Sequence, residues 1–217
     1  MSIKALIFDL DGVLTDTAIY HYHAWKALAD ELAIPFNEQD NEQLKGVDRL
    51  GSLRLILQKG QLSLSPDEEQ WLMASKNQHY LELIADMNPA ALFSGTHELF
   101  AELKQRGIKT ALASASKNAG FVVERLGIAG QFDYIADAAK VANSKPAPDI
   151  FLLAAKGLGV APQNCVGVED AQAGIAAICS AGMLPVGIGD AAVLQDALLV
   201  YPALDKLNLQ QVLSLSH

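Results

Sequence analysis

The chain has 217 residues, of which 51% are hydrophobic and 19% are charged. This balance predicts a soluble globular protein with an ample core and excludes a disordered chain. The net charge of −9 argues against a broad surface for nucleic acid or for an anionic membrane. We therefore expect neither partner, although local lysines and a metal ion would still allow a small anionic ligand.

The two cysteines and the apolar runs predict the compartment. Cys165 and Cys179 have no CxxC spacing and no metal-type histidine cluster beside them, which is typical of small buried side chains in a reducing compartment. No apolar run reaches the length of about 18 residues that a membrane span needs, and no signal-like segment precedes the first predicted strand. We expect a cytoplasmic protein, and a monomer because no exposed apolar stripe stands out.

The first predicted strand ends in acidic residues. Residues 5–8 and Leu10 form an apolar run that predicts a strand buried on both faces, and Asp9, Asp11 and Gly12 lie at its end. Alternation along an extended chain points both carboxylates the same way. Two converging carboxylates repel each other unless a cation or a shared proton relieves them, and Mg²⁺ prefers such oxygen ligands. The alternative interpretation is a strand that runs into an ordinary Asp-Gly turn.

The next part of the chain is helical. Ser65 and Pro66 mark a helix start, and Pro35 marks the end of an earlier helix. No convincing strand occurs between residues 17 and 92, so we predict a helical cap domain over residues 16–92, inserted between core segments 1–15 and 93–217. The helices predicted in this insert span residues 19–33, 41–44, 50–58 and 66–87.

Strands and helices alternate after residue 95. This alternation predicts an α/β fold with a doubly wound parallel sheet, as in Rossmann-like proteins. A last helix or short arm is expected from residue 207 onwards. The predicted strands span residues 108–113, 132–136, 164–168 and 184–188, and the predicted helices span residues 96–106, 118–126, 148–158 and 171–181.

Polar side chains follow three predicted strands. Asp9 and Asp11 follow the first, Ser114 follows another, and Glu169 and Asp170 follow a third. The carboxyl ends of parallel strands meet at one edge of a sheet, so we expect these groups to converge. Metal ligation explains the four carboxylates together. The alternatives are that Asp170 caps the following helix and that Ser114 caps a helix or forms a turn.

Lys145 stands in a loop that two prolines stiffen, Pro146 and Pro148. A solvated surface lysine is the default interpretation. The alternative is an ammonium held in place by the rigid loop to offset the charge of a phosphate.

Residues 9–16, DLDGVLTD, resemble the first motif of the haloacid dehalogenase (HAD) superfamily of phosphotransferases. The resemblance implies that Asp9 is a nucleophile that forms an aspartyl-phosphate and that Asp11 is a general acid/base. It further implies that Ser114 hydrogen-bonds the transferring phosphate and that Lys145 offsets its charge and positions Asp9. One Mg²⁺ ion per chain is implied, with Asp9, Asp11, Glu169 and Asp170 as its ligand set.

Residues 17–25, 44–49 and 114–118 are similar to segments of the β-phosphoglucomutase family within that superfamily. This resemblance implies a cap unit of His21 and Lys45 that senses a sugar, and an Arg49 that binds a distal phosphate. Without it, His21 would be interpreted as a packed helix-face histidine and Arg49 as a solvated or salt-bridged residue. The implied hinge is Thr15, Asp16 and Thr17, and the implied substrate-binding set comprises His21, Trp25, Lys45, Gly46, Val47, Arg49, Lys76, Ser114, Ala115, Ser116, Lys117 and Asn118.

The segment around Arg49 departs from this pattern at two positions. Residue 48 is Asp, where related mutases carry Ser or Thr before the arginine, and residue 50 is Leu rather than an acidic residue. A carboxylate at residue 48 would repel a distal phosphate unless Asp48 points away or pairs with Arg49.

These residues lead to a ranked set of functions. The first hypothesis is a mutase that interconverts β-D-glucose 1-phosphate and D-glucose 6-phosphate through an aspartyl-phosphate and a bisphosphate intermediate. The second is a HAD-type phosphatase of a small sugar phosphate. A dehalogenase is disfavoured because it has no use for Asp11 as an acid/base, and a non-catalytic phosphosugar-binding regulator has no use for a nucleophile.

Overall fold

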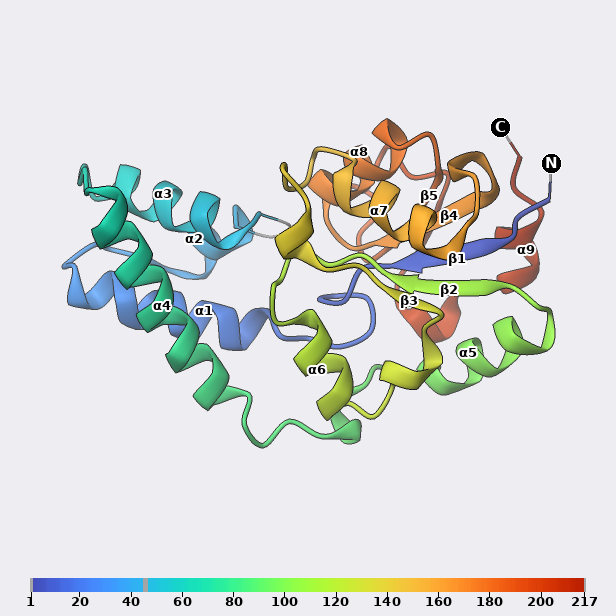
Figure 1. The fold of residues 1–217 in the computed structure, drawn as a ribbon, viewed down its shortest axis with the longest axis horizontal. Coiled ribbons are helices and arrows are strands. Elements are labelled where there is room, and N and C mark those ends of the chain that lie inside the picture. Colours follow the sequence, from blue (N-terminus) through green and yellow to red (C-terminus); the bar gives the residue numbers. More distant parts are fainter. Residues whose placement is uncertain (1, 45–46, 217) are drawn as a thin grey trace.

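The computed structural model describes residues 2–44 and 47–216, and within them a six-stranded sheet has the order β3-β2-β1-β4-β5-β6. All strand pairs are parallel. β1 lies between β2 and β4, so the strand order reverses beside it, which confirms the predicted doubly wound α/β fold (Figure 1). The strands are β1 (Ala5–Phe8), β2 (Lys109–Leu112), β3 (Tyr134–Ile135), β4 (Cys165–Glu169), β5 (Leu184–Ile188) and β6 (Leu199–Tyr201).

Helices cover both faces of the sheet. Apolar side chains of its central strand point alternately to the two faces, and each set packs against helices. Leu6 and Phe8 of β1 belong to the core cluster that includes α5 (Thr96–Gln105), α6 (Ala119–Arg125) and α9 (Leu209–Leu213). Ala5 and Ile7 belong to the cluster on the other face, with α7 (Asp149–Leu158) and α8 (Gln172–Ser180). The four residues are fully buried, as expected for a strand between two helical layers.

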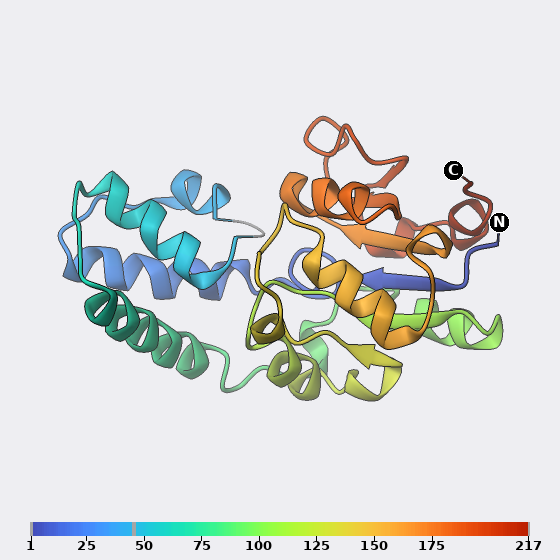
Figure 2. The ribbon, with the colours of Figure 1, turned by 45° about the horizontal axis from the view of Figure 1, so that its top comes forward.

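The helical segment lies to one side of the sheet and away from both termini (Figures 1 and 2). Its helices are α1 (Ala18–Glu31), α2 (Glu38–Glu42), α3 (Arg49–Lys59) and α4 (Pro66–Leu83). They enclose a core cluster of their own around Trp25, Leu53 and Leu72, and the described residues between 17 and 92 contain no strand. The end of α4 instead joins the sheet cluster through Tyr80, as does Ile84 just beyond it.

The two chain connections to this helical segment lie side by side. The Phe93 amide donates to the Leu14 carbonyl at 2.9 Å, and the Thr15 hydroxyl donates to the Ala91 carbonyl at 2.8 Å. Thr15 and Thr17 are buried and Asp16 is exposed. The division into core segments 1–15 and 93–217 and a cap over residues 16–92, with a hinge at Thr15, Asp16 and Thr17, stays a prediction.

Some local predictions differ from the structure. α2 begins earlier than predicted because Asn37 and Asp40 form a capping box around its first turn. The edge strand β6 was not predicted, since a three-residue strand leaves little periodic signal. The prediction that both cysteines are buried is wrong for Cys179, which is exposed at the end of α8, while Cys165 is buried. Short 3₁₀ helices span Pro89–Ala91, Ala129–Gln131, Ala138–Lys140, Pro162–Asn164 and Leu204–Lys206.

Candidate active site

A buried lysine sits between two carboxylates at the end of the sheet. Lys145 Nζ lies 2.8 Å from Asp9 Oδ1 and 2.6 Å from Glu169 Oε1. Asp9 extends β1, since its amide donates to the Val168 carbonyl at 2.9 Å, and Glu169 ends β4. Only 3% of Lys145 is exposed, so the interpretation as a solvated surface lysine is wrong. Neighbouring strands thus hold the two carboxylates, and these bind the Lys145 ammonium, which the loop before α7 supplies.

Two glycines, which have no side chain, leave room for the carboxylates of Glu169 and Asp170. Glu169 Oε2 accepts from the Ala171 amide at 2.7 Å while Oε1 binds Lys145, so both of its oxygens are used. A side chain at Gly174 would overlap the Glu169 carboxylate, and one at Gly12 would overlap the Asp170 carboxylate. Gly12 also has a φ of +74°, which glycine adopts without strain.

Three carboxylates gather in a geometry that suits a hard cation. One oxygen each from Asp9, Glu169 and Asp170 lie within 4.8 Å of one another. Lys145 is the ammonium that binds Asp9 and Glu169 here, and a divalent cation would further relieve the repulsion among the gathered carboxylates. The predicted ligand Asp11 is not in this group, and its Oδ1 accepts a hydrogen bond from the Thr17 hydroxyl. Nor does Asp170 cap α8, whose N-cap residue is Ala171.

Burial raises the pKa values of the two aspartates. Burial, and then the Glu169 charge, raise the pKa of Asp9 to about 6 against the opposing effect of Lys145. Burial and the charge of Asp9 raise the pKa of Asp11 to about 8. Burial acts to lower the pKa of Lys145, but Asp9 and Glu169 outweigh it and hold this pKa above its usual range. The two carboxylates thus favour the charged form of Lys145.

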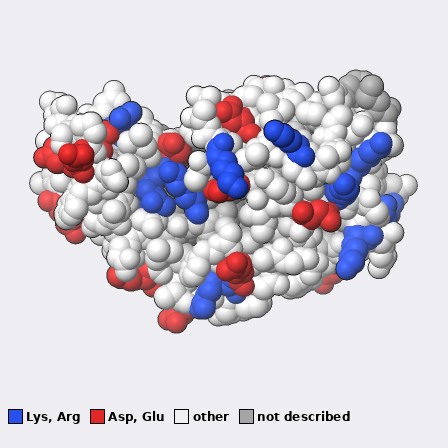
Figure 3. All heavy atoms as spheres, in the orientation of Figure 1, with Lys and Arg blue, Asp and Glu red and all other residues white. Residues whose placement is uncertain are grey.

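A cavity of about 160 Å³ opens above these residues and is lined from both the sheet and the helical segment. Figure 3 shows basic side chains gathered at the hollow between the two parts of the molecule. Glu169 and Asn118 are not in the lining, and Gly12, Ala18, Asn41, Leu44 and Ser52 line it although they were not predicted. The predicted residues that line the cavity are Asp9, Asp11, His21, Trp25, Val47, Arg49, Lys76, Ser114, Ala115, Ser116, Lys117, Lys145 and Asp170.

The helical side of the cavity holds a second buried lysine. Lys76 Nζ lies 2.7 Å from His21 Nδ1 and 4.5 Å from the ring centre of Trp25. His21 stacks on Tyr80 with ring centres 4.1 Å apart. Burial, and then the Arg49 charge, lower the pKa of Lys76 to about 7, and burial and Lys76 lower the pKa of His21. A neutral His21 accepts from Lys76 through Nδ1.

Arg49 and Asn118 meet at a residue that was not predicted. Arg49 Nη2 donates to Asn77 Oδ1 at 2.7 Å, and Asn118 Nδ2 donates to the same oxygen at 2.8 Å. Ser116 lies beside them in sequence and its hydroxyl accepts from the Asn118 amide at 3.2 Å. Ser114 likewise accepts from the Ser116 amide at 3.1 Å, so it forms the turn that was its alternative interpretation. A lone asparagine on a helix carries no sequence signal that could have singled out Asn77.

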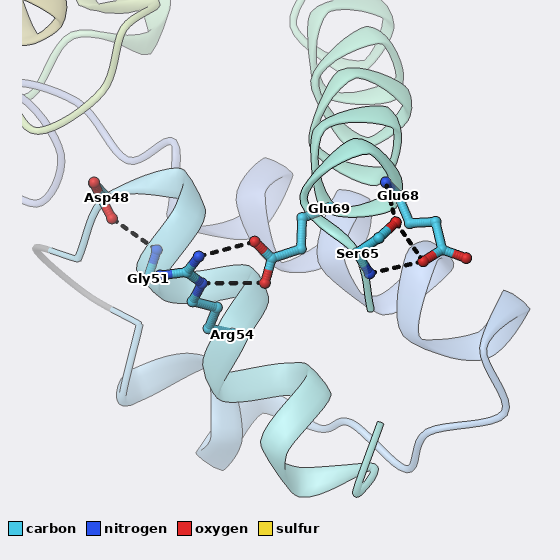
Figure 4. A network of polar contacts seen from close by, with 6 residues as sticks. All are labelled: Asp48, Gly51, Arg54, Ser65, Glu68 and Glu69. Carbon is cyan, nitrogen blue, oxygen red and sulfur yellow. Dashed lines mark hydrogen bonds and ion pairs between the residues drawn. The ribbon is translucent and has the colours of Figure 1, made fainter. Parts of the chain in front are cut away.

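Asp48 is turned toward its own helix. Its Oδ1 accepts from the Gly51 amide at 2.8 Å, which makes it the N-cap of α3 (Figure 4). The same view shows Arg54 of α3 joined to Glu69 of α4 by hydrogen bonds of 3.1 and 3.0 Å. Asp48 therefore does not pair with Arg49, and α3 and α4 are tied together. The predicted residues Lys45 and Gly46 lie outside the described residues.

Comparisons with known proteins agree with this geometry. A family model described as haloacid dehalogenase-like hydrolase matches residues 3–182. A β-phosphoglucomutase of Bacillus subtilis is 48% identical over 86% of this chain and 84% of its own length. A fructose-1-phosphate phosphatase of Escherichia coli is 31% identical over 84% of this chain and 95% of its own.

Solved structures extend the likeness to the fold. A crystal structure of β-phosphoglucomutase from Clostridium difficile superimposes with a TM-score of 0.95 at 47% identity, and the match covers 97% of this chain and 95% of that one. The resemblance seen in residues 9–16 is therefore confirmed over most of the chain. The chain belongs to the haloacid dehalogenase-like hydrolase family.

Proposed function

We propose that this chain is a β-phosphoglucomutase, an isomerase that interconverts β-D-glucose 1-phosphate and D-glucose 6-phosphate through an aspartyl-phosphate on Asp9 and β-glucose 1,6-bisphosphate. The sequence identity of 48% with the Bacillus subtilis enzyme and of 47% with the Clostridium difficile enzyme supports this assignment. Two relatives, from Thermotoga maritima and Escherichia coli, are named as phosphatases, so residues of the cavity must distinguish a mutase from a phosphatase.

One observation supports the proposal: a single cavity is lined by the groups proposed to hold the transferring phosphate and by cations proposed to hold a second one. Asp9, Ser114 and Lys145 line one part of it, and Arg49 and Lys117 line it as well. Phosphoryl transfer needs positioning and charge neutralisation around one phosphate. A mutase must hold a second phosphate at the same time, and Arg49, Ser116, Lys117 and Asn118 are the proposed ligands for it.

The proposed reaction uses Asp9 and Asp11 in turn. Phosphorylated Asp9 gives its phosphate to the C6 hydroxyl of β-glucose 1-phosphate while Asp11 takes the hydroxyl proton. The bisphosphate then turns over in the cavity, and Asp9 attacks the C1 phosphate while Asp11 returns the proton to the leaving C1 oxygen. The enzyme is phosphorylated again and the product is glucose 6-phosphate. Thr17 holds Asp11 in place through its hydroxyl.

Asp9 and Asp170 are the proposed side-chain ligands of one Mg²⁺ ion per chain, with Glu169 close enough to contribute. When bound, such an ion neutralises charge on the transferring phosphate. Since Lys145 and the Ala171 amide engage both Glu169 oxygens, we propose that Glu169 chiefly holds Lys145. A single chain supplies every proposed group, and the monomeric state stays a prediction.

The cap groups would favour a sugar over water. Buried Lys76 and Trp25 and half-buried His21 form a contiguous unit that lines the same cavity as Asp11. A sugar that fills this space would exclude water, which otherwise hydrolyses the aspartyl-phosphate. The phosphatase alternative has the same nucleophile with water as acceptor, and the likeness to the Escherichia coli phosphatase keeps it as the second candidate.

The nucleophile variant tests the proposed chemistry. Asp9→Asn should abolish both mutase and phosphatase activity and should prevent transfer of ³²P from labelled bisphosphate to the protein, because an amide cannot form the acyl phosphate. Asp67→Asn, on the exposed first turn of α4, is the matched control and should keep both activities and the label. Survival of either activity in Asp9→Asn would exclude the covalent mechanism.

A further inference from the structure

Asn77 joins the helical segment to the sheet part through one oxygen atom. It lies on α4 between Lys76 and Gln78, and its Oδ1 accepts from Arg49 of α3 at 2.7 Å and from Asn118 Nδ2 at 2.8 Å. Asn118 is the N-cap residue of α6, yet its side chain makes no cap hydrogen bond. The Asn118 amide group is instead directed to the helical segment.

The chemistry of the partners fixes the orientation of this junction. A guanidinium has donors only, so the Asn77 atom that faces Arg49 must be its oxygen. The Asn118 atom that faces the same oxygen must then be its NH₂ group. One acceptor thus collects two donors, one from each part of the molecule.

This arrangement resembles what a phosphate oxygen would offer. Arg49 and Asn118 are two of the proposed ligands of the distal phosphate. Before a phosphate binds, the Asn77 oxygen is the shared acceptor that keeps their donors directed at one point. The Arg54–Glu69 pair, with hydrogen bonds of 3.1 and 3.0 Å, keeps α3 beside α4, so Arg49 and Asn77 keep their relative position. Donors held ready in advance bind an anion at a lower entropic cost.

We propose that Asn77 is a positioning residue for the distal phosphate. Its amide oxygen holds Arg49 and Asn118 together before the substrate arrives, and a phosphate oxygen then takes over one or both donors. Asn77 contacts no reacting atom in this account. The inference relies on the proposed function only for the identity of the ligand, a sugar that carries a phosphate remote from the transferring one.

Two substitutions separate positioning from general damage to the fold. Asn77→Ala removes the acceptor, and it should raise KM for β-glucose 1-phosphate and Kd for D-glucose 6-phosphate about tenfold, the scale of one organised hydrogen bond, with little change in kcat. Asn77→Asp keeps an acceptor but adds a negative charge that competes for Arg49, so it should raise both constants further. Gln78→Ala, on the exposed face of the same helix, is the control and should change neither.

Hydrolysis of p-nitrophenyl phosphate, which has no second phosphate, gives the complementary readout. A positioning role leaves its kcat/KM unchanged in Asn77→Ala, whereas a structural defect would lower it together with the melting temperature. Unchanged or tighter binding of glucose 6-phosphate by Asn77→Ala, or an equal loss with both substrates, would overturn the inference.

The Kd for glucose 6-phosphate, measured by isothermal titration calorimetry, distinguishes failure of this inference from failure of the proposed function. If the wild-type chain binds glucose 6-phosphate but does not convert β-glucose 1-phosphate, the proposed function fails, while a tenfold weaker Kd in Asn77→Ala still supports the positioning role. If the wild-type chain converts the substrate and Asn77→Ala does so with the same KM, the inference fails and the function stands. Lack of binding by the wild-type chain would overturn both.

Discussion

At the scale of single residues, the site depends on charges that are buried in pairs. Lys145 is stable in the interior because Asp9 and Glu169 lie 2.8 and 2.6 Å from it, and removal of one partner of such a group is costly. The position of Glu169 depends in turn on the missing side chain of Gly174. A change that touches none of the predicted catalytic residues should therefore still disturb the site.

Gly174→Ala tests this dependence. The new methyl group would overlap the Glu169 carboxylate, so the variant should lose about 1–3 kcal/mol of stability and most of its activity. Gly120→Ala is the matched control, since Gly120 is also helical and has no neighbour near its Cβ position. It should keep full activity and gain up to about 1 kcal/mol. Urea denaturation and kcat measurements distinguish the two, and equal behaviour of both variants would contradict the account.

Lys76 should make stability depend on pH. Burial, followed by the Arg49 charge, lowers its pKa from 10.5 to about 7. Between these values the unfolded chain binds one more proton than the folded chain, so Lys76 makes the folded state more stable as pH rises and disfavours it below that window. Lys76→Met removes this effect. The wild type should therefore gain up to about 1.4 kcal/mol per pH unit relative to Lys76→Met across the middle of that window, and a flat difference in unfolding free energy would contradict it.

At the scale of elements, helix ends determine where the ligand groups point. Asp48 departs from the mutase pattern, and the expected repulsion of a phosphate assumed a side chain directed at the ligand. Its carboxylate instead accepts from Gly51 at 2.8 Å and begins α3, which carries Arg49. A sequence does not reveal whether an acidic residue faces a ligand or caps a helix, because both roles favour the same residue type.

The capping role predicts how Asp48 can be replaced. Asp48→Thr keeps a capping oxygen and should leave both stability and KM for β-glucose 1-phosphate near the wild-type values. Asp48→Ala should cost about 1 kcal/mol of stability through the lost cap. Thermal or urea denaturation and steady-state kinetics check both variants. A clearly lower KM in Asp48→Thr would show that the carboxylate does repel the phosphate.

At the scale of the whole molecule, most of the fold could be predicted because local and global signals agree. The buried run of β1, the helix stops at glycine and the strand–helix alternation all indicate one parallel sheet, and Asp9, Ser114 and Glu169 lie at the strand ends where that topology places them. Contacts between distant segments carry no such signal. The Asn77 junction and the Thr17–Asp11 hydrogen bond depend on how the helical segment sits against the sheet, and the pairing of Lys76 with His21 depends on how α4 packs against α1.

The assembled cavity also decides which acceptor receives the phosphate. Sheet-end residues alone suit any phosphotransferase of the family. Of the groups proposed to hold a second phosphate, Arg49 comes from the helical segment and residues 116–118 come from the loop after β2, and the groups proposed to exclude water come from the helical segment. None of the described helices is long and apolar enough to cross a membrane. The partition of phosphate between sugar and water is therefore the quantity that distinguishes a mutase from a phosphatase.

The most direct test of the mutase assignment is ³¹P NMR of the protein with Mg²⁺, β-D-glucose 1-phosphate and a trace of β-glucose 1,6-bisphosphate. The account predicts that the glucose 1-phosphate signal is replaced by glucose 6-phosphate, with little inorganic phosphate. Inorganic phosphate as the main product would contradict the mutase assignment and favour the phosphatase.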